Sequence, residues 1–502
     1  MNEIQSISSS LKNGIDALKE LNNVIYPNSI NKIQNEIFFL ARINKSKNLI
    51  IGNPGPVART FQGENYENDE FKVCPLSEFN TAVMRETFQW TNPCAVGSRT
   101  SFGTGDRIGA ATPGHIRAIK DHDIFPVLAQ QSMREMGRTN RTPRQVIDDT
   151  VWGVFESGWK NGYGADADHI KKPEEAVECF KLGYTMFTID ACENINIRGH
   201  SMSDKEVVKE FHKLSGSGSL RENYLTKTIY FKDELAELTF NITEVSLARA
   251  AVTNMGAIIH FKQVYDALKK AAKDKTFDFE VSVDETSIPT SPEEHYFIAS
   301  ELKRLGVKFA SLAPRFIGEF QKGIDYIGDV KKFEKEFAAH ALIARNMGNY
   351  KISVHSGSDK FSIFPIVGKY TNGFFHVKTA GTSWLEAVRV IAKNDPDLYR
   401  EMHKHALERF EEDRQSYHVT TNLGAIQDIN KLKDNELPAL LDKNDSRQLI
   451  HITYGSILTA MDRKKKLKFR ERFYRNLFDH EEDHYRFLEK HIGKHVELLK
   501  LD

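Results

Sequence analysis

Short apolar or β-branched runs alternate with longer stretches of helical periodicity from about residue 96 onward. The pattern predicts strands at 100–109, 125–132, 185–191, 277–285, 307–314, 350–356, 374–381 and 417–422. The intervals carry helical patterns, and several of these end in glycine, a common residue just beyond a helix C-terminus. Strand alternating with helix indicates parallel strands joined by crossover helices, and eight such units fit a (β/α)8 barrel of the TIM type.

A doubly wound parallel sheet is the competing architecture for such an alternating pattern. It would normally have fewer strands and a glycine-rich phosphate-binding turn after the first of them. The number of runs therefore favours the barrel, which we expect to occupy residues 96–424 as the catalytic domain.

The regions before and after the predicted barrel lack the alternation of strands and helices. Residues 1–95 predict a helical and irregular cap, because SINKIQNEIFFLARI has apolar residues at helical spacing and residues 51–95 are interrupted by Gly, Pro and Asn. Residues 425–502 predict a charged helical extension, which we expect to be a solvated appendage with some use between subunits. Assembly into a homo-oligomer is left open by the sequence.

Charge and cysteine content narrow the class of protein. The 502 residues hold 69 Lys and Arg against 69 Asp and Glu, which disfavours a nucleic-acid or anionic-membrane partner. The sequence contains no apolar run near the ~18 residues of a membrane span and no pattern of a secretory signal. Four cysteines without CxxC spacing suit a reducing, cytoplasmic location. A small molecule is the expected partner.

Polar side chains recur at or near the ends of the predicted strands. Barrel enzymes place catalysis at the carboxyl ends of their strands, so this recurrence indicates an active site. Each residue alone is a weak signal, because an isolated Asp or Ser after a strand is often a helix N-cap. The set comprises Asp106, Arg107, Ser132, Thr188, Asp190, Asp284, Glu285, Arg315, His355, His376, Lys378 and Asn422.

Imidazole and carboxylate groups at separate strand ends are typical ligands of Zn, Mn, Co or Ni. His355 follows a β-branched run, His169 lies in GADADHI before a helix beginning at Pro173, and Glu285 ends a run. These three are candidate metal ligands. Each has a structural alternative. His355 could be a strand-end histidine that hydrogen-bonds its neighbours, His169 could belong to an acidic cluster that caps the following helix, and Glu285 could be an ordinary loop carboxylate.

Small residues after the run at 350–356 offer an anion-binding turn. In HSGSDK the backbone N–H groups can approach an anion, and Lys360 adds positive charge. The segment is a weak signal by itself, because Gly/Ser turns are common. His376 and Lys378 share one face of their predicted strand, which could instead point outward.

Longer blocks of the sequence carry a family resemblance. TSFGTGDRIGAATPGHIRA, GADADHIK, FEVSVDET, PTSPEEHYFIA, APRFIGEFQKGIDYIGD and VHSGSDKFSIFP resemble the tagaturonate/fructuronate epimerase family over nearly the whole chain. DADHIKKPEEAVECFKLGYTMFTIDA and HSGSDK also resemble local stretches of class II aldolases, although HSGSDK lacks their paired glycines. A free acid sugar is therefore favoured over a sugar phosphate.

The resemblance implies a metal-dependent isomerase of hexuronate catabolism that interconverts D-tagaturonate and D-fructuronate. It implies one divalent cation (Mn, Ni, Co or Zn) bound by His169 and His355, with Glu319 as a further ligand. Asp168 and Glu285 would transfer protons. Ser132, Thr188, Asp190 and His376 would contact the substrate, and Arg315, Lys360 or Lys378 would supply a cation for the uronate carboxylate.

The chemistry of such an epimerisation favours retro-aldol cleavage. The inverted carbon lies β to the ketone, so the carbonyl does not acidify its C–H bond. A metal can stabilise an enediolate while a base takes the β-hydroxyl proton, and re-addition to the rotated aldehyde then gives the epimer. The alternatives are a class II-type aldolase, which would release the fragments, and an inactive carbohydrate-binding barrel.

Overall fold

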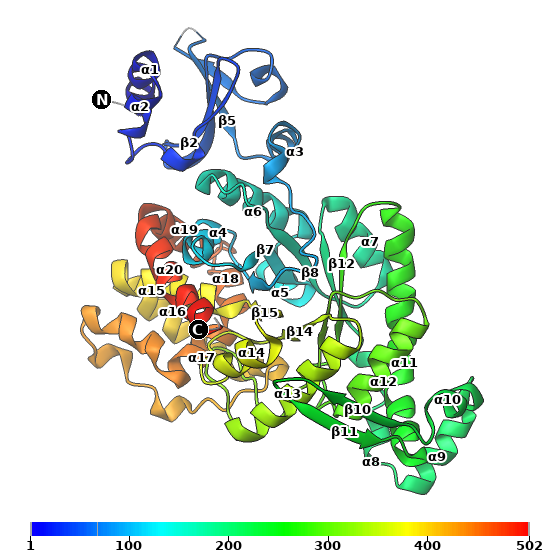
Figure 1. Ribbon diagram of the computed structural model, residues 1–502. Helices are drawn as coiled ribbons and strands as arrows, with labels where there is room; N and C mark the ends of the chain where they lie inside the picture. Colours follow the sequence, from blue (N-terminus) through cyan, green and yellow to red (C-terminus); the bar gives the residue numbers. More distant parts are fainter. Residues whose placement is uncertain (1–2, 68, 500–502) are drawn as a thin grey trace.

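The computed structural model describes residues 3–67 and 69–499. Within them, eight parallel strands close a barrel in the order β12-β13-β14-β15-β6-β7-β8-β9, which confirms the (β/α)8 prediction (Figure 1). The strands are β6 Ser101–Thr104, β7 Phe125–Ser132, β8 Gly164–Ile170, β9 Met186–Asp190, β12 Asp278–Ser282, β13 Ser311–Ala313, β14 Lys351–Val354 and β15 Phe375–Thr379.

Helices surround the barrel and account for the apolar stripes between strands. They are α4 Thr112–Ile119, α5 Met133–Thr139, α6 Pro143–Ser157, α7 Pro173–Leu182, α11 Glu244–Ala272, α12 Pro292–Arg304, α13 Val330–Asn346, α14 Phe364–Thr371 and α15 Gly381–Asn394. Local sequence sets their ends. A capping box of Ser291 and Glu294 starts α12, and Gly183, with φ 107°, ends α7. Because these helices pack outside the barrel, its strands are buried on both faces.

The structure corrects two of the strand predictions. Residues 417–422 form no strand: they lie between the 3-10 helices η5 Arg414–Ser416 and η6 Leu423–Ala425 and alternate between half-buried and exposed. The missing barrel strand is β8, whose sequence GADADHI lacks an apolar run because polar side chains fill the barrel interior there. An apolar pattern cannot detect a strand whose inner face carries carboxylates.

The helical prediction for SINKIQNEIFFLARI is also wrong. The segment forms β1 Asn31–Ile33 and β2 Glu36–Ile43, part of an antiparallel sheet with β3 Ser46–Gly52, β4 Glu64–Tyr66 and β5 Phe71–Pro75. Helices α1 Glu3–Asn13 and α2 Ile15–Lys19 cover one face of this sheet through Ile7 and Leu18, and the other face packs toward the barrel. A strand buried on both faces is uniformly apolar, so its periodicity resembles that of a buried helix.

A long insertion between β9 and β12 extends to one side of the barrel (Figure 1). It contains α8 Arg198–Ser201, α9 Asp204–Lys213, α10 Ser217–Tyr224 and the hairpin of β10 Thr228–Lys232 and β11 Glu237–Asn241. Remaining short elements are α3 Glu78–Thr87 and the 3-10 helices η1 Pro27–Ser29, η2 Ala58–Thr60, η3 Gln89–Thr91, η4 Cys192–Asn194, η7 Ile429–Lys431 and η8 Asp434–Asp442.

The C-terminal helices are packed against the barrel, in contrast to the expected solvated appendage. They are α16 Pro396–Asp413, α17 Asn444–Ile452, α18 Tyr454–Thr459, α19 Arg470–Asp479 and α20 Glu481–Leu499. Helix α20 contacts α4, α14 and α15 and buries Leu488, Ile492 and Val496, which recur every four residues. Because α20 also contains many charged residues, its composition alone does not reveal this apolar stripe. In the described part of the chain, every helix is too short or too polar to span a bilayer.

Candidate metal centre in the barrel cavity

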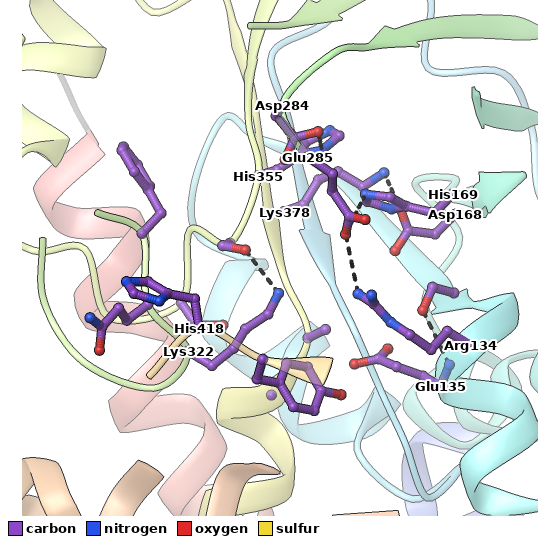
Figure 2. A pocket seen from close by; sticks show the side chains of 18 of the residues that line it. Arg134, Glu135, Asp168, His169, Asp284, Glu285, Lys322, His355, Lys378 and His418 are labelled. Atoms are coloured by element: carbon purple, nitrogen blue, oxygen red, sulfur yellow. Dashed lines mark hydrogen bonds and ion pairs between the residues drawn. The ribbon is translucent and has the colours of Figure 1, made fainter. Parts of the chain in front are cut away.

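A polar cavity of about 320 Å³ opens at the carboxyl ends of the barrel strands (Figure 2). This volume lies at the lower end of the ~300–1,000 Å³ typical of small-molecule sites. Its ionisable lining residues include Arg107, Arg134, Glu135, Asp168, His169, Asp284, Glu285, Arg315, Glu319, Lys322, His355, Lys378 and His418. Strand-end polarity in the sequence therefore marks the position of a cavity.

His169, Asp284 and His355 form a cluster that could hold a metal ion. One ligand atom from each residue lies within 4.8 Å of the others, and the two imidazole centroids are 5.2 Å apart. The residues come from β8, from the loop after β12 and from the end of β14. Three strands thus bring together groups that are far apart in the chain.

The backbone at His169 is irregular in a way that turns its side chain. Its φ is 56°, a left-handed value uncommon for a non-glycine residue, and the β8–β9 register shifts between Ala167 and Ile170. Strained conformations of this kind cost ~1–3 kcal/mol and gather at functional sites, and irregular strands re-aim side chains. His169 Nδ1 is 2.8 Å from Asp168 Oδ1, whereas the buried Nε2 has no hydrogen-bond partner among the described residues.

His355 is fixed between two carboxylates. Its Nε2 lies 2.7 Å from Glu280 Oε1 and its Nδ1 lies 2.9 Å from Asp284 Oδ1. Burial opposes protonation, but Asp284 and Glu280 together raise the pKa of His355 to about 10. Ser311 Oγ donates to the other Glu280 oxygen at 2.6 Å, which holds that carboxylate in place.

These contacts fit a divalent cation. Each histidine has a carboxylate on one nitrogen, as metal-bound histidines commonly do, and directs the other nitrogen to the cluster. The 2.9 Å between His355 Nδ1 and Asp284 Oδ1 suits a shared proton or two ligands of one ion, and a metal would displace that proton. The partnerless Nε2 of His169 is the clearest indication.

Lys378 offsets part of the negative charge of three carboxylates beneath the cluster. Its side chain is 4% exposed, and its Nζ lies 2.6 Å from Asp166, 2.5 Å from Asp168 and 3.3 Å from Glu280. It also donates to Thr188 Oγ1 at 2.5 Å. Despite burial, Lys378 and His169 hold the pKa of Asp168 well below its usual value. Lys378 is therefore an internal counter-ion.

Glu285 lies at the exposed edge of the cluster. Its side chain is 35% exposed and accepts a hydrogen bond from Arg134 at 3.2 Å. Glu285 Oε1 is 3.7 Å from His169 Nε2. The carboxylate thus faces both the cavity and the unpartnered histidine nitrogen.

Four predicted substrate contacts are outside the cavity lining. Thr188 belongs to the Lys378 network, and Asp190 Oδ1 accepts from Cys192 N at 2.9 Å. His376 Nδ1 is 2.9 Å from Ser101 Oγ, and burial lowers the pKa of His376 to about 3. Lys360 Nζ donates to backbone carbonyls of Gln321, Ile324 and Ser358 at 2.8, 2.5 and 3.0 Å. The Lys360 side chain holds its own loop instead of facing the cavity.

Three other predicted residues line the cavity but lie outside the metal cluster. Glu319 Oε2 is 3.0 Å from His418 Nε2, Ser132 Oγ caps α5, and Arg315 donates to the carbonyls of Phe316 and Gly318. The sequence did not identify Asp284 as a candidate ligand or Glu280 as the carboxylate that holds His355. Their signal was present: carboxylates alternate with apolar residues in DFEVSVDE, which indicates a polar inner face.

A second histidine–carboxylate cluster lies between the loop after β14 and α20. It contains Asp359, His491 and His495. His495 Nε2 accepts from Asp359 N at 2.9 Å and its Nδ1 donates to His491 O at 2.8 Å. Asp359 contacts His491 Nε2 at 2.6 Å and Arg447 at 2.7 Å. Both nitrogens of His495 are therefore occupied by the backbone.

A closed (β/α)8 barrel with a histidine–carboxylate cluster in a cavity at its carboxyl strand ends has the architecture of a barrel enzyme. A family model described as tagaturonate epimerase matches residues 26–499. Tagaturonate/fructuronate epimerase of Thermotoga maritima is 44% identical over 478 residues, 95% of this chain and 97% of its own. The chain belongs to the tagaturonate epimerase family, as the sequence blocks predict.

Solved structures agree over nearly the full length. Native and glycerol-bound crystal structures of fructuronate-tagaturonate epimerase from Cohnella laeviribosi match with a TM-score of 0.91 at 42% identity. Each match covers 97% of this chain and 99% of the crystallised chain. The barrel and its flanking regions are therefore common to both proteins.

Proposed function

We propose that the chain interconverts D-tagaturonate and D-fructuronate with a divalent cation held by His169, Asp284 and His355. Family membership over residues 26–499 supports the reaction. The observation that carries the metal assignment is the buried Nε2 of His169, which has no hydrogen-bond partner in the described part of the chain and belongs to a cluster that also contains a carboxylate and a second imidazole. Mn, Ni, Co and Zn all suit such nitrogen and oxygen ligands.

The reaction must invert a carbon that the ketone does not activate. The two hexuronates differ at C4, whereas the ketone is at C2. Loss of the C4 hydroxyl proton lets the C3–C4 bond break, with its electron pair moving to C3 and into the enediolate. C4 becomes an aldehyde, rotates and is attacked again by C3 on its other face, and the proton returns to the C4 oxygen.

Glu285 is the proton-transfer residue in this proposal. Its carboxylate lines the cavity beside the metal cluster and is partly exposed, so it can exchange protons with both substrate and solvent. Asp168, the other predicted proton-transfer residue, is engaged by His169 and Lys378. This geometry favours Asp168 as a positioning residue that orients His169.

A bound divalent cation would supply Lewis acidity toward the oxygen atoms of the substrate. The chain supplies the remaining functions. Glu280 and Asp168 orient the two imidazoles, and Lys378 favours the ionised form of both carboxylates inside the barrel. Their combined negative charge suits a cation in the cavity.

Turnover of tagaturonate in D2O by the metal-loaded protein tests the proposal. We expect fructuronate whose C4 retains its original hydrogen, because the retro-aldol route never breaks the C4–H bond. Deuterium at C4 would show direct deprotonation and contradict the route, and failure to form fructuronate would contradict the function. Net release of three-carbon products would identify an aldolase. The same protein after exhaustive chelation is the control.

A further inference from the structure

We propose that Lys322 binds the substrate carboxylate and retains the carboxylate-bearing fragment during the reaction. The inference rests on the proposed function and adds a residue that determines substrate specificity. It replaces Arg315, Lys360 and Lys378, the three cations that the sequence offers for the uronate carboxylate. The proposal rests on the position of Lys322. This half-buried lysine lines the cavity opposite His169 and has no carboxylate partner among the described residues.

The cavity contains several cations, but most are already engaged. Lys378 contacts three carboxylates, Arg107 pairs with Glu135 at 2.5 Å, and Arg134 pairs with Glu285 at 3.2 Å. Arg315 directs two of its nitrogens to carbonyl groups of its own loop. A carboxylate that approached these groups would have to compete with contacts inside the protein.

Lys322 differs from these cations. In the described ranges, its Nζ makes no ion pair and donates to Ser356 Oγ at 2.8 Å. An ammonium group has three N–H donors, so two remain for a ligand. The charge of Lys322 acts on Glu135 in the cavity: although burial opposes it, Arg107 and Lys322 hold the pKa of Glu135 below its usual value.

The position of Lys322 is fixed by its surroundings. Gln448 donates to Lys322 O at 3.4 Å, and Arg447 donates to the next carbonyl, Gly323 O, at 2.8 Å. Ser356, which holds the ammonium group, directly follows His355. These hydrogen bonds hold the loop that carries Lys322 and fix its ammonium group relative to the proposed metal ligands. Figure 2 shows it on the opposite side of the cavity from Asp168 and His169.

This arrangement matches the distribution of charge in an open-chain hexuronate. A cation held by His169, Asp284 and His355 would attract the ketone and its neighbouring hydroxyl, and the carboxylate is at the far end of the molecule. Cleavage of C3–C4 leaves the carboxylate on the aldehyde fragment, C4–C6. A cation on that carboxylate keeps the fragment in place while C4 rotates, which separates an epimerase from an aldolase.

The test compares Lys322→Gln and Lys322→Arg with Lys308→Gln, an exposed lysine outside the cavity. Hydrogen bonds to charged groups contribute enough to change affinity by ~10–100-fold. We therefore expect Lys322→Gln to raise KM for tagaturonate by about that factor. It should also release dihydroxyacetone, the fragment without the carboxylate, once water has protonated its enediolate. Lys322→Arg should restore both properties in large part, because it restores the charge.

The proposal is overturned if KM for Lys322→Gln equals that of Lys308→Gln, or if dihydroxyacetone release does not exceed that control. A purely structural role would lower kcat without releasing fragments, and Arg would not rescue it. Failure of the proposed function is distinguishable, since the wild-type protein would then form no fructuronate or would introduce deuterium at C4.

Discussion

The two histidine–carboxylate clusters contain the same residue types but differ in what remains unbound. In the barrel cavity, His169 Nε2 is buried and has no hydrogen-bond partner among residues 3–67 and 69–499, and its other nitrogen is oriented by Asp168. Beside α20, backbone groups occupy both nitrogens of His495, and Arg447 neutralises Asp359. Ligand-type residues in proximity are therefore insufficient for a metal site. A site also needs donor atoms that the fold leaves unsatisfied.

The second cluster has a structural role that follows from the same contacts. Asp359 follows the loop residues Ser356 and Ser358 that line the cavity, and its partners His491 and His495 lie on α20. The cluster thus ties the C-terminal helix to the loop after β14. The proposed metal site and the loop beside it are therefore held by different clusters.

The largest predicted difference between the clusters is in metal content. His169→Ala and His355→Ala should each lose most bound metal and most activity with the fold retained, because each removes a ligand of the cavity site. His491→Ala should keep its metal. Elemental analysis of the purified variants, with circular dichroism as the folding control, measures this. Equal metal loss in all three variants would show that the comparison is wrong.

Asp359→Asn should produce the opposite pattern, a loss of stability without loss of metal. Arg447 is buried, and removing Asp359, its partner at 2.7 Å, leaves only Glu386 at 3.9 Å to offset its charge. Breaking a buried ion pair typically costs ~3–5 kcal/mol, and Glu386 places the expected loss toward the lower end of that range. Urea unfolding gives the free-energy change. Asp16→Asn, in an exposed pair with Lys19, is the matched control and should change stability by under ~1 kcal/mol. Loss of metal from Asp359→Asn would contradict a purely structural cluster.

Asp168→Asn separates positioning from proton transfer. If Asp168 orients His169, metal affinity should fall ~10–100-fold, as for other groups that support metal ligands. A proton-transfer role would instead lower kcat ~10²–10⁴-fold with metal content unchanged. The geometry predicts the first result, measured by metal titration together with kcat at saturating metal. The second result would return Asp168 to the catalytic role.

The smallest expected effect is a pH dependence from His495. Burial lowers the pKa of His495 to about 3, so between pH 6.5 and 3 the unfolded chain binds a proton that the folded chain does not. The contribution of neutral His495 to the free energy of unfolding is therefore fully present above pH 6.5. It decreases as the pH falls, by at most ~1.4 kcal/mol per pH unit. His495→Gln lacks this group. Urea unfolding at pH 7.5 and 5.5 should show the wild type declining more than the variant, and a constant difference would contradict the assignment.

The sequence predicts the barrel architecture and names His169 and His355 as candidate metal ligands, on different grounds. His355 follows a predicted barrel strand, and barrel strands end at one face. His169 follows no predicted strand and is a candidate because it lies in GADADHI before a helix. What failed was the detection of β8, because carboxylates replace the apolar inner face there. The error at β2 arose because a fully buried strand has no alternation.

Side-chain direction in loops could not be predicted. Lys322 and Lys360 both lie in glycine-containing segments after barrel strands, and both carry the same charge. Only the tertiary structure shows that backbone carbonyls capture Lys360 while Lys322 faces the cavity. The partner of a flexible side chain depends on segments distant in sequence, which pattern and composition do not specify.

Anomalous diffraction from crystals grown with the activating cation tests the central claim most directly. The account predicts an anomalous peak within ~2.0–2.2 Å of His169 Nε2, His355 Nδ1 and a carboxylate oxygen of Asp284, and none between Asp359, His491 and His495. A peak in the second cluster, or no peak in the first, would contradict it.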